Sequence, residues 1–198
     1  MALPKSSFTD TTSKNYLIDA AVLFYNVTFD ELAGEFSGTL AGATSGGVTF
    51  TDERSYRDIE VDGATKMKVK GNKVLESANA TLVANVKELT AENIRKAING
   101  TIRDALATEA PAGFKVIEPK VAIDDADYIE NMALYGKLSS GQEIIVIIDN
   151  ALATGGLEIA TEDNNEAVVE MTFEAHATVE QLNSGTLPWR ILMPGIAA

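Results

Sequence analysis

The stretch LTAENIRKAINGTIRDAL, residues 89–106, is the one part of the sequence where apolar residues recur at helical rather than strand spacing. Its apolar side chains fall on one side of a 3.6-residue repeat, and most of its polar side chains fall on the other. Thr90 is a suitable N-cap, and Glu92 places a carboxylate in the first turn. Gly100 costs about 1 kcal/mol relative to Ala in a helix interior, so the helix must depend on packing. The stretch predicts a single long helix laid against a body of strands.

Most of the remaining sequence has the pattern of β-strands. Residues 78–86 alternate most regularly between apolar and polar, and they lead directly into the predicted helix. Residues 144–148 are apolar on both faces, which predicts a central strand. Residues 166–178 predict a long strand with its apolar side chains inward. The outward side chains of that strand are Glu170, Thr172, Glu174 and His176. Further strands are expected at residues 48–50, 114–117 and 128–138. Residues 16–25 fit a helix or a strand by periodicity, and the aromatic and β-branched residues of 22–27 favour a strand.

Residues 56–70 predict a hairpin around Asp62-Gly63. A two-residue loop would place apolar residues of one strand on the same face as lysines of the other. A three-residue turn at residues 61–63 is therefore favoured, and it sets Asp58 opposite Lys66.

Three other segments lack a strand or helix pattern. Residues 30–47 carry five glycines and few large apolar groups, which is typical of a functional or mobile loop. Residues 1–14 are polar and rich in Ser and Thr, so a loose N-terminal arm is expected. Residues 188–198 are expected to form a C-terminal arm that needs something to pack against. Nothing in the composition marks a second domain, so residues 1–198 are expected to form one.

Composition excludes several classes of protein. The chain has no Cys, which rules out disulfides, thiolate zinc sites and Cys nucleophiles. Its formal net charge of -13 argues against binding a phosphate backbone tightly. The same charge suits a protein that must not adhere to a passing polyanion. No apolar stretch approaches the roughly 18 residues of a membrane span, and the N-terminal residues have no apolar core of a signal peptide.

A search for catalytic or metal-binding motifs finds none. The only histidine, His176, lies on the polar side of a predicted strand and has no nucleophile motif near it, so a solvated strand residue is expected. Residues 124–127, DDAD, resemble part of a calcium loop but lack its glycine and terminal glutamate, which favours a polar turn. Residues 42–47, GATSGG, precede a strand rather than a helix, so no phosphate loop is predicted. No cofactor, no metal and no enzymatic activity are expected.

The order of several segments resembles the major tail protein family of long-tailed, non-contractile bacterial viruses, the siphoviruses. The segments are IDAAV (residues 18–22), GATSGGVTF (42–50), YRDIEVDGA (56–64) and KELTAEN (87–93). The resemblance covers residues 15–106, and the second half agrees only in being rich in strands. It implies a mainly β (α+β) fold, a β-sandwich or barrel flanked by one α-helix, similar to phage tail tube and type VI secretion tube proteins. It also implies a structural virion protein whose hexameric rings stack into the hollow tail tube that conducts the genome during ejection.

The resemblance further implies sites, partners and a location. Family members join one ring to the next through a long loop between early strands and through the terminal arms. The candidates at that place are Gly34, Gly38, Gly42, Ala43, Thr44, Ser45, Gly46 and Gly47. An ordinary mobile loop is the alternative. The candidate lumen wall is the face with Glu170, Thr172 and Glu174, which would repel passing DNA, and an outer solvated face is its alternative.

The implied partners are copies of the chain itself, a tape measure protein and a tail terminator protein. The implied location is the virion tail, after assembly in the cytoplasm of the bacterial host. Two other classes stay open. A virion decoration or baseplate binding module could use the same sandwich, and a hydrolase would need paired carboxylates in a pocket.

Overall fold

A computed structural model describes residues 8–9, 12–63, 67–159, 161, 163 and 166–195. The described elements are η1 (Thr12–Lys14), β1 (Leu17–Asp30), β2 (Glu35–Leu40), β3 (Thr44–Asp58), β4 (Lys73–Val86), α1 (Ala91–Ala97), β5 (Thr101–Asp104), β6 (Lys115–Glu118), η2 (Asp125–Asp127), β7 (Ile129–Leu138), β8 (Glu143–Ala153), β9 (Val169–Glu174), α2 (Val179–Ser184) and β10 (Trp189–Leu192). Neither α-helix among the described residues is long and apolar enough to cross a bilayer.

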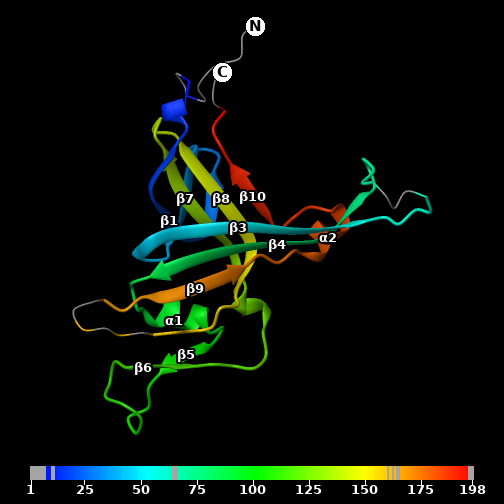
Figure 1. Ribbon diagram of the computed structural model, residues 1–198. Coiled ribbons are helices and arrows are strands. Elements are labelled where there is room, and N and C mark those ends of the chain that lie inside the picture. Colours follow the sequence, from blue (N-terminus) through cyan, green and yellow to red (C-terminus); the bar gives the residue numbers. More distant parts are fainter. Residues whose placement is uncertain are drawn as a thin grey trace.

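The strands form two crossed antiparallel layers that share β8. The strand order is β2-β1-β7-β8-β9-β4-β3, and β10 also pairs with β8. The first part of β8 pairs with β7 and β10, whereas its last residues, Leu152 and Ala153, pair with β9. In Figure 1, β1, β7, β8 and β10 run upward, and β3, β4 and β9 cross in front of them. The predicted fold class is confirmed: the chain is mainly β, with α1 at the flank of an antiparallel sandwich.

The core lies between the two layers. Its largest fully buried side chains are Phe173, Leu23, Leu82, Met132, Ile148, Met171 and Val86. The rings of Tyr25 and Phe173 meet edge to face across the core, with centroids 6.4 Å apart. Burial, with a smaller effect of Glu92, raises the pKa of Tyr25 to about 12. From α1, the Lys96 ammonium lies 4.3 Å from the Tyr25 ring centroid, so the helix closes one end of the core.

Two strand predictions are confirmed in detail. Along residues 78–86, the side chains of Ala80, Leu82, Ala84 and Val86 are buried and alternate with more exposed ones. Residues 144–148 lie in β8, which has neighbours on both sides and buried residues on both faces. Alternation of apolar and polar residues therefore identified β4, and a continuous apolar run identified the central strand β8.

The long helix predicted at residues 89–106 is wrong. The helix α1 covers only Ala91–Ala97, although Thr90 does cap it, with its Oγ1 accepting a hydrogen bond from the Asn93 N–H at 3.1 Å. Asn99 then adopts a φ of 48° and donates from its side chain to the Ala153 carbonyl. A Cβ at Gly100 would lie 2.6 Å from the Glu118 carbonyl oxygen, so the chain is pressed against β6 there. Residues 101–104 pair with β6 as a strand, and this tertiary pairing overrides the helical pattern.

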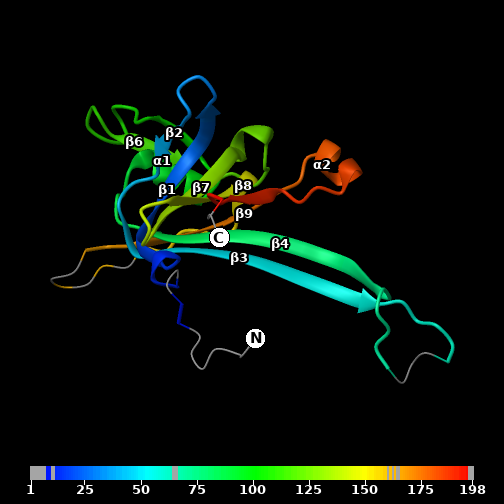
Figure 2. The same ribbon diagram turned by 90° about the horizontal axis from the view of Figure 1, so that it is seen from above.

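The predicted hairpin has a different register. Asp58 lies opposite Lys73, with an ion pair of 3.5 Å, and not opposite Lys66, which lies outside the described residues. The connection therefore spans residues 59–72 rather than three residues. Figure 2 shows β3 and β4 extending together well beyond the body of the molecule. Asp62-Gly63 does form a turn, but this turn is only one part of the long connection between β3 and β4.

The ion pairs of Glu92 predict a pH effect on stability. Its carboxylate accepts hydrogen bonds from Arg95 at 2.7 and 3.0 Å and lies 3.0 Å from Lys96 Nζ. The Arg95 hydrogen bonds, with those of Lys96 and against partial burial, lower the pKa of Glu92 to about 2. Because the folded pKa lies below the unfolded one, this stabilisation is present above about pH 4.3 and is lost as the pH falls toward 2. Between about pH 5 and 2.5, we expect Glu92→Gln to lose less thermal stability than the wild type. Equal losses in calorimetry would contradict this assignment.

Candidate functional site: assembly surfaces

The predicted glycine-rich loop at residues 30–47 is an ordered strand and two short connections. Its middle forms β2, and its end is the start of β3. The Asp30 carboxylate accepts hydrogen bonds from the Leu32 and Ala33 N–H groups at 2.8 and 3.1 Å, and Gly34, with a φ of 69°, completes the turn. The segment predicted as a functional or mobile loop therefore contains a paired strand, β2. Small residues are present because the backbone is tightly turned or closely packed, and not because it lacks structure.

The eight candidate residues occupy four places. Gly34 ends the β1–β2 turn, and Gly38 lies in β2, where a Cβ would come within 2.9 Å of Val27 Cγ2. Gly42 and Ala43 lie beside α1, and the Ala43 N–H donates to Glu88 Oε1 at 2.9 Å. The remaining four candidates, Thr44, Ser45, Gly46 and Gly47, begin β3 at an irregularity in its pairing with β4. The structure does not bring the eight together.

An open edge of the sheet lies at β2. This strand ends the strand order, and all six of its residues are exposed. The Phe29 and Phe36 rings pack on each other at 4.9 Å across the β1–β2 pair, and Phe36 is still 39% exposed. An exposed strand edge with aromatic side chains offers a template for pairing with another chain.

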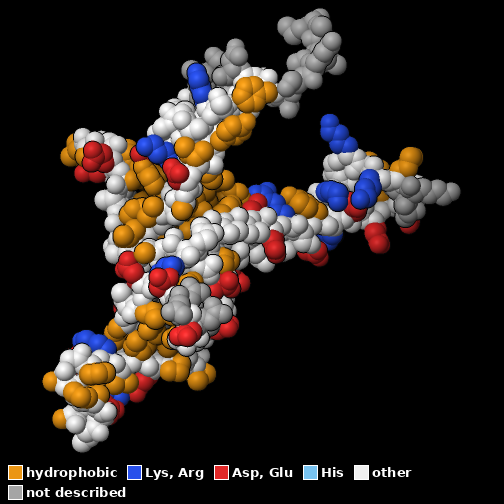
Figure 3. Space-filling view, turned by 60° about the vertical axis from the view of Figure 1, so that its left-hand side comes forward, with side chains coloured by type: hydrophobic (Ala, Val, Ile, Leu, Met, Phe, Trp, Pro, Cys, Tyr) orange, Lys and Arg blue, Asp and Glu red, His pale blue; other side chains and the backbone are white. Residues whose placement is uncertain are grey.

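An apolar groove of about 540 Å³ lies between β2 and the outer face of the β1–β7–β8 layer. Its apolar lining comes from Phe24, Val27, Phe36, Ala133, Tyr135 and Ile145, and its charged lining from Glu35 and Glu143. A hydrogen bond to Glu143, with some burial, raises the pKa of Tyr135 to about 12. Figure 3 shows apolar side chains gathered on this side of the molecule, between its projections. We call this groove, which Gly34, Ser37 and Gly38 also line, the acidic groove.

A second surface is the outer half of the β3–β4 hairpin, which we call the ribbon. Residues 53–58 and 73–77 are exposed on both faces. The connection at its end exposes large apolar side chains, including Val61, Met67 and Val69. A two-stranded hairpin without a third layer is marginally stable in water. The ribbon therefore has little support from the rest of the described chain.

A third projection is the β5–β6 hairpin, at the bottom of Figure 1. Arg103 links its strands and its loop, with Nη1 2.7 Å from Glu109 Oε2 and Nη2 3.0 Å from Glu118 Oε1. Leu106 and Phe114 are exposed at its end. Ion pairs of exposed groups contribute little individually, so this hairpin also has little support of its own.

The predicted lumen residues share one face of β9, as their alternation predicted. Glu170 is exposed, whereas Thr172 and Glu174 are half-buried. Thr172 is partly covered, because a Cβ at Gly155 would lie only 3.0 Å from its Cβ. The strand ends at Glu174 and not at residue 178. Of the three, Glu170 alone is an exposed carboxylate.

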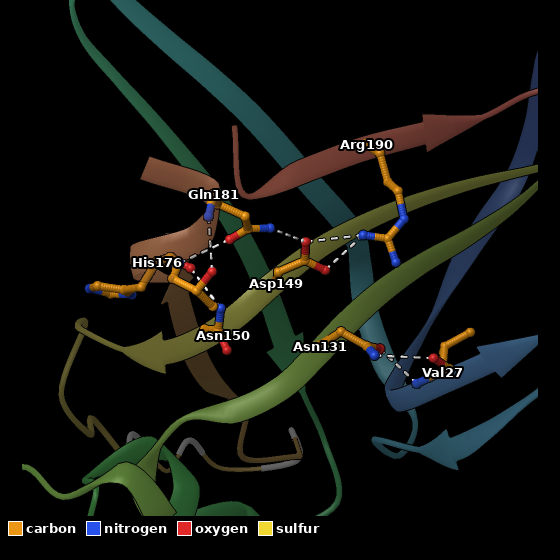
Figure 4. Close-up of polar contacts among 8 residues, drawn as sticks. Val27, Asn131, Asp149, Asn150, His176, Gln181 and Arg190 are labelled. Atoms are coloured by element: carbon orange, nitrogen blue, oxygen red, sulfur yellow. Dashed lines mark hydrogen bonds and ion pairs between the residues drawn. The ribbon is translucent and has the colours of Figure 1, made fainter. Parts of the chain in front are cut away.

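The predicted C-terminal arm at residues 188–198 is only partly an arm. Residues 189–192 form β10 on the edge of β8, so this part packs against its own chain, and residues 196–198 lie outside the described residues. The Asp149 carboxylate accepts hydrogen bonds from Arg190 Nη1 at 2.8 and 3.0 Å and from Gln181 Nε2 at 3.0 Å (Figure 4). Asp149 thus connects β8 with both β10 and α2, a helix that the sequence pattern did not predict.

The predicted N-terminal arm, residues 1–14, is described at residues 8–9 and 12–14 only. The described end forms η1 against the β7–β8 turn. There the Ser140 N–H donates to the Lys14 carbonyl at 3.0 Å, and the Ser139 hydroxyl donates to the Ser13 carbonyl. The arm is therefore attached to the sandwich at its root.

His176 and the DDAD segment, the residues considered above for catalysis or metal binding, make contacts within the fold. His176 is half-buried, with its Nδ1 3.1 Å from the Glu174 carbonyl oxygen and its ring edge to face with Tyr128 at 5.2 Å. The DDAD segment forms the predicted polar turn, and Lys120 Nζ lies 2.6 and 2.7 Å from Asp124 and Asp127. Within the described ranges, no group of three or more His, Asp or Glu side chains is placed to hold a metal ion.

The sequence did not predict the acidic groove or the part that Phe36 and Glu143 take in its lining. Phe36 was assigned to a loop, and Glu143 lies at a turn between two predicted strands. One available signal was charge: residues 15–53 contain six acidic residues and no Lys or Arg. Such segregation of charge along a chain points to an interaction surface.

Comparison with known proteins gives distant structural likenesses only. No family model matches the chain, and no curated protein matches it. Among solved structures, it is similar to a chain of the virion of a native gene transfer agent particle, with a TM-score of 0.40 and 12% identity over 80% of this chain and 92% of that one. It is also similar to a chain of the anti-feeding prophage baseplate, 6-fold symmetrised, with a TM-score of 0.43 and 10% identity over 99% of this chain and 100% of that one. Neither likeness assigns a role to this chain.

Proposed function

We propose that this chain is a structural, non-enzymatic virion protein that self-assembles into stacked hexameric rings and so forms the hollow tail tube of a siphovirus. The ribbon carries this proposal. It projects beyond the body, it is exposed on both faces, and its tip presents large apolar side chains. Together with the open edge at β2, it leaves strands that neighbouring copies can complete.

The acidic face of β9 suits the wall of the lumen in this proposal. Glu170 and Glu174 lie on one side of the strand, and the chain as a whole has a net charge of -13. Negative charge facing the channel would keep DNA from adhering while it passes. The Gly34–Gly47 candidates belong to the contacts between rings, and the tape measure and tail terminator proteins are the further partners. Assembly takes place in the host cytoplasm, and the product is located in the virion tail.

Self-assembly of purified protein tests the proposal. We expect concentrated protein to form long hollow tubes with six-fold end views in negative-stain electron micrographs. Because subunits of charge -13 repel one another, moderate salt should favour assembly. A virion decoration or baseplate module would instead remain small without its partner. Protein that stays monomeric at every salt and protein concentration would contradict the tube proposal.

Charge reversal on β9 tests the assignment of the lumen. In virions that carry Glu170→Lys and Glu174→Lys, tubes should form normally but DNA ejection should be slowed or blocked, because cations in the channel would bind the phosphate backbone. Glu180→Lys on α2, a charge reversal at an exposed position on another element, serves as the control. Normal ejection from the β9 variant, measured by DNA release, would place this face outside the channel.

Hydrogen exchange tests the role of β2 in assembly. All six residues of the strand are exposed and one of its edges is open, so its outward amides should exchange fast in monomers. In tubes, pairing or covering by a neighbour should slow them, whereas buried β8 should be protected in both states. Equal exchange of β2 in monomers and tubes would remove it from the interface.

A further inference from the structure

The tip of the ribbon and the acidic groove have opposite charge and matching apolar content. Residues 63–75 contain four lysines and no acidic residue, in a chain with only 16 Lys and Arg against 29 Asp and Glu. Of these, Lys68 and Lys70 alternate with Met67 and Val69. All four of these residues are exposed, with Met67 at 81%. We call residues 67–70 the lysine tip.

In the free chain, residues 67–70 lie outside β3 and β4, with a bend at Met67 and a turn at Lys70. Docked as an extended strand, the tip would place Met67 and Val69 on one side and the two lysines on the other, because successive side chains of a strand point in opposite directions. The long lysine stems can lie along an apolar surface while their ammonium groups reach a charged rim. The tip therefore suits a groove that is apolar at its base and acidic at its margin.

The acidic groove has this composition. Its base is apolar, and the charged residues among its described lining are Glu35 and Glu143. Glu31 is exposed in the turn that leads into β2, and the open edge of β2 lies beside the groove. Lys137 is opposite Glu143 in the β7–β8 register, so the strongest negative charge lies at the β1–β2 end. A strand that added to β2 would bring its side chains to this end.

The two surfaces cannot meet within one molecule. In Figure 2 the ribbon extends to one side of the body, and the β1–β2 hairpin projects from another, far from the tip. The occupant of the groove must then come from a second copy. Because donor and acceptor surfaces differ, each copy can give one contact and receive one, which produces a closed ring or an open polymer rather than a simple dimer.

We propose that the lysine tip of one copy docks in the acidic groove of the next copy, with Met67 and Val69 toward the apolar base and Lys68 and Lys70 toward Glu31 and Glu35. This inference rests on the proposed self-assembly and adds which two surfaces make the contact. It commits to a second copy of this chain as the occupant.

Charge reversal on each surface provides the first test. Lys68→Glu with Lys70→Glu (tip variant) and Glu31→Lys with Glu35→Lys (groove variant) should each lose polymers in sedimentation velocity, because like charges then meet. An equimolar mixture of the two variants should regain polymers, since both kinds of junction again pair opposite charges. Lys14→Glu, an exposed reversal on η1, is the matched control and should assemble as the wild type does.

Cysteine crosslinking provides a second test that does not depend on charge. Because the chain has no Cys, Val69→Cys with Ser37→Cys leaves only the engineered pair to react. Ser37 lines the acidic groove. Oxidation of the assembled variant should give ladders of covalently linked copies. Val121→Cys with Ser37→Cys is the control, because Val121 is fully exposed on another segment, and it should give no ladder.

The outcomes separate this docking from the proposed function. If wild-type tubes form but the tip variant assembles equally well, or the mixture fails to recover, the docking is overturned and the tube proposal stands. The same holds if the Val69 pair gives no more ladder than the Val121 pair. If the wild type never polymerises, the tube proposal fails and the docking fails with it.

Discussion

Replacing Phe173 with Ala should lower the free energy of unfolding of the monomer by about 3–5 kcal/mol. The Phe173 side chain is 0% exposed and lies in β9 between the two layers. It pairs in register with Leu82 of β4 and Ala153 of β8, and its ring contacts Tyr25 of the other layer. Removing the ring leaves a cavity at the place where the two layers meet, which the surrounding strands cannot close. Chemical denaturation followed by the fluorescence of Trp189, the single Trp, measures the loss.

Phe114→Ala is the matched control for this prediction. Phe114 is the same residue type, but it is exposed at the end of the β5–β6 hairpin. Its truncation should change the free energy of unfolding of the monomer by no more than about 0.5 kcal/mol. A similar loss for both variants would mean that the core does not lie between the layers as described.

Asp149→Ala should lower the free energy of unfolding by about 1–3 kcal/mol. Its effect should be confined to β10 and α2. The Asp149 side chain is mostly buried and accepts the hydrogen bonds of Arg190 and Gln181 that attach β10 and α2 to β8. Without it, β10 should open more often than the rest of the sandwich. Hydrogen exchange should then become faster at residues 189–192 and in α2, while β4 and β7 keep their protection.

Asp104→Ala is the control for the Asp149 prediction. Asp104 also forms an ion pair, with Lys115 at 2.5 Å, but its side chain is 83% exposed, so little stability should be lost. Uniformly faster exchange over the whole chain in Asp149→Ala would show a global loss of stability rather than release of the C-terminal elements.

The sequence predicted those parts of the fold in which local pattern and tertiary position agree. The alternation of residues 78–86 and the apolar run of residues 144–148 identified the centres of β4 and β8. The pattern failed where a distant segment decides the structure. Residues 101–104 follow a helical repeat, but β6 pairs with them as a strand. Likewise, several lysines follow Asp58 in the sequence, and a hairpin could pair any of them with it. In the structure Asp58 pairs with Lys73.

Glycine content misled the prediction of the candidate site. Five glycines in residues 30–47 suggested a loop, yet Gly38 is a strand residue whose missing side chain lets β2 lie close to Val27. The acidic β9 face was predicted because alternation within one strand needs no tertiary information. The acidic groove could not be predicted in that way, since its lining comes from β1, β2, β7 and β8, which are far apart in the sequence.

The strand order also bears on the time at which the acidic groove can form during synthesis. β1 completes its sheet with β7, as the contact between Val27 and Asn131 across 104 residues shows, and β8 receives β10 from the last part of the chain. Such distant pairings are slow to form, and a growing polypeptide on the ribosome cannot make them until the later strands have emerged. The groove that β1, β2, β7 and β8 build together is therefore absent from nascent chains. Any contact that uses this groove must therefore wait until β8 has left the ribosome.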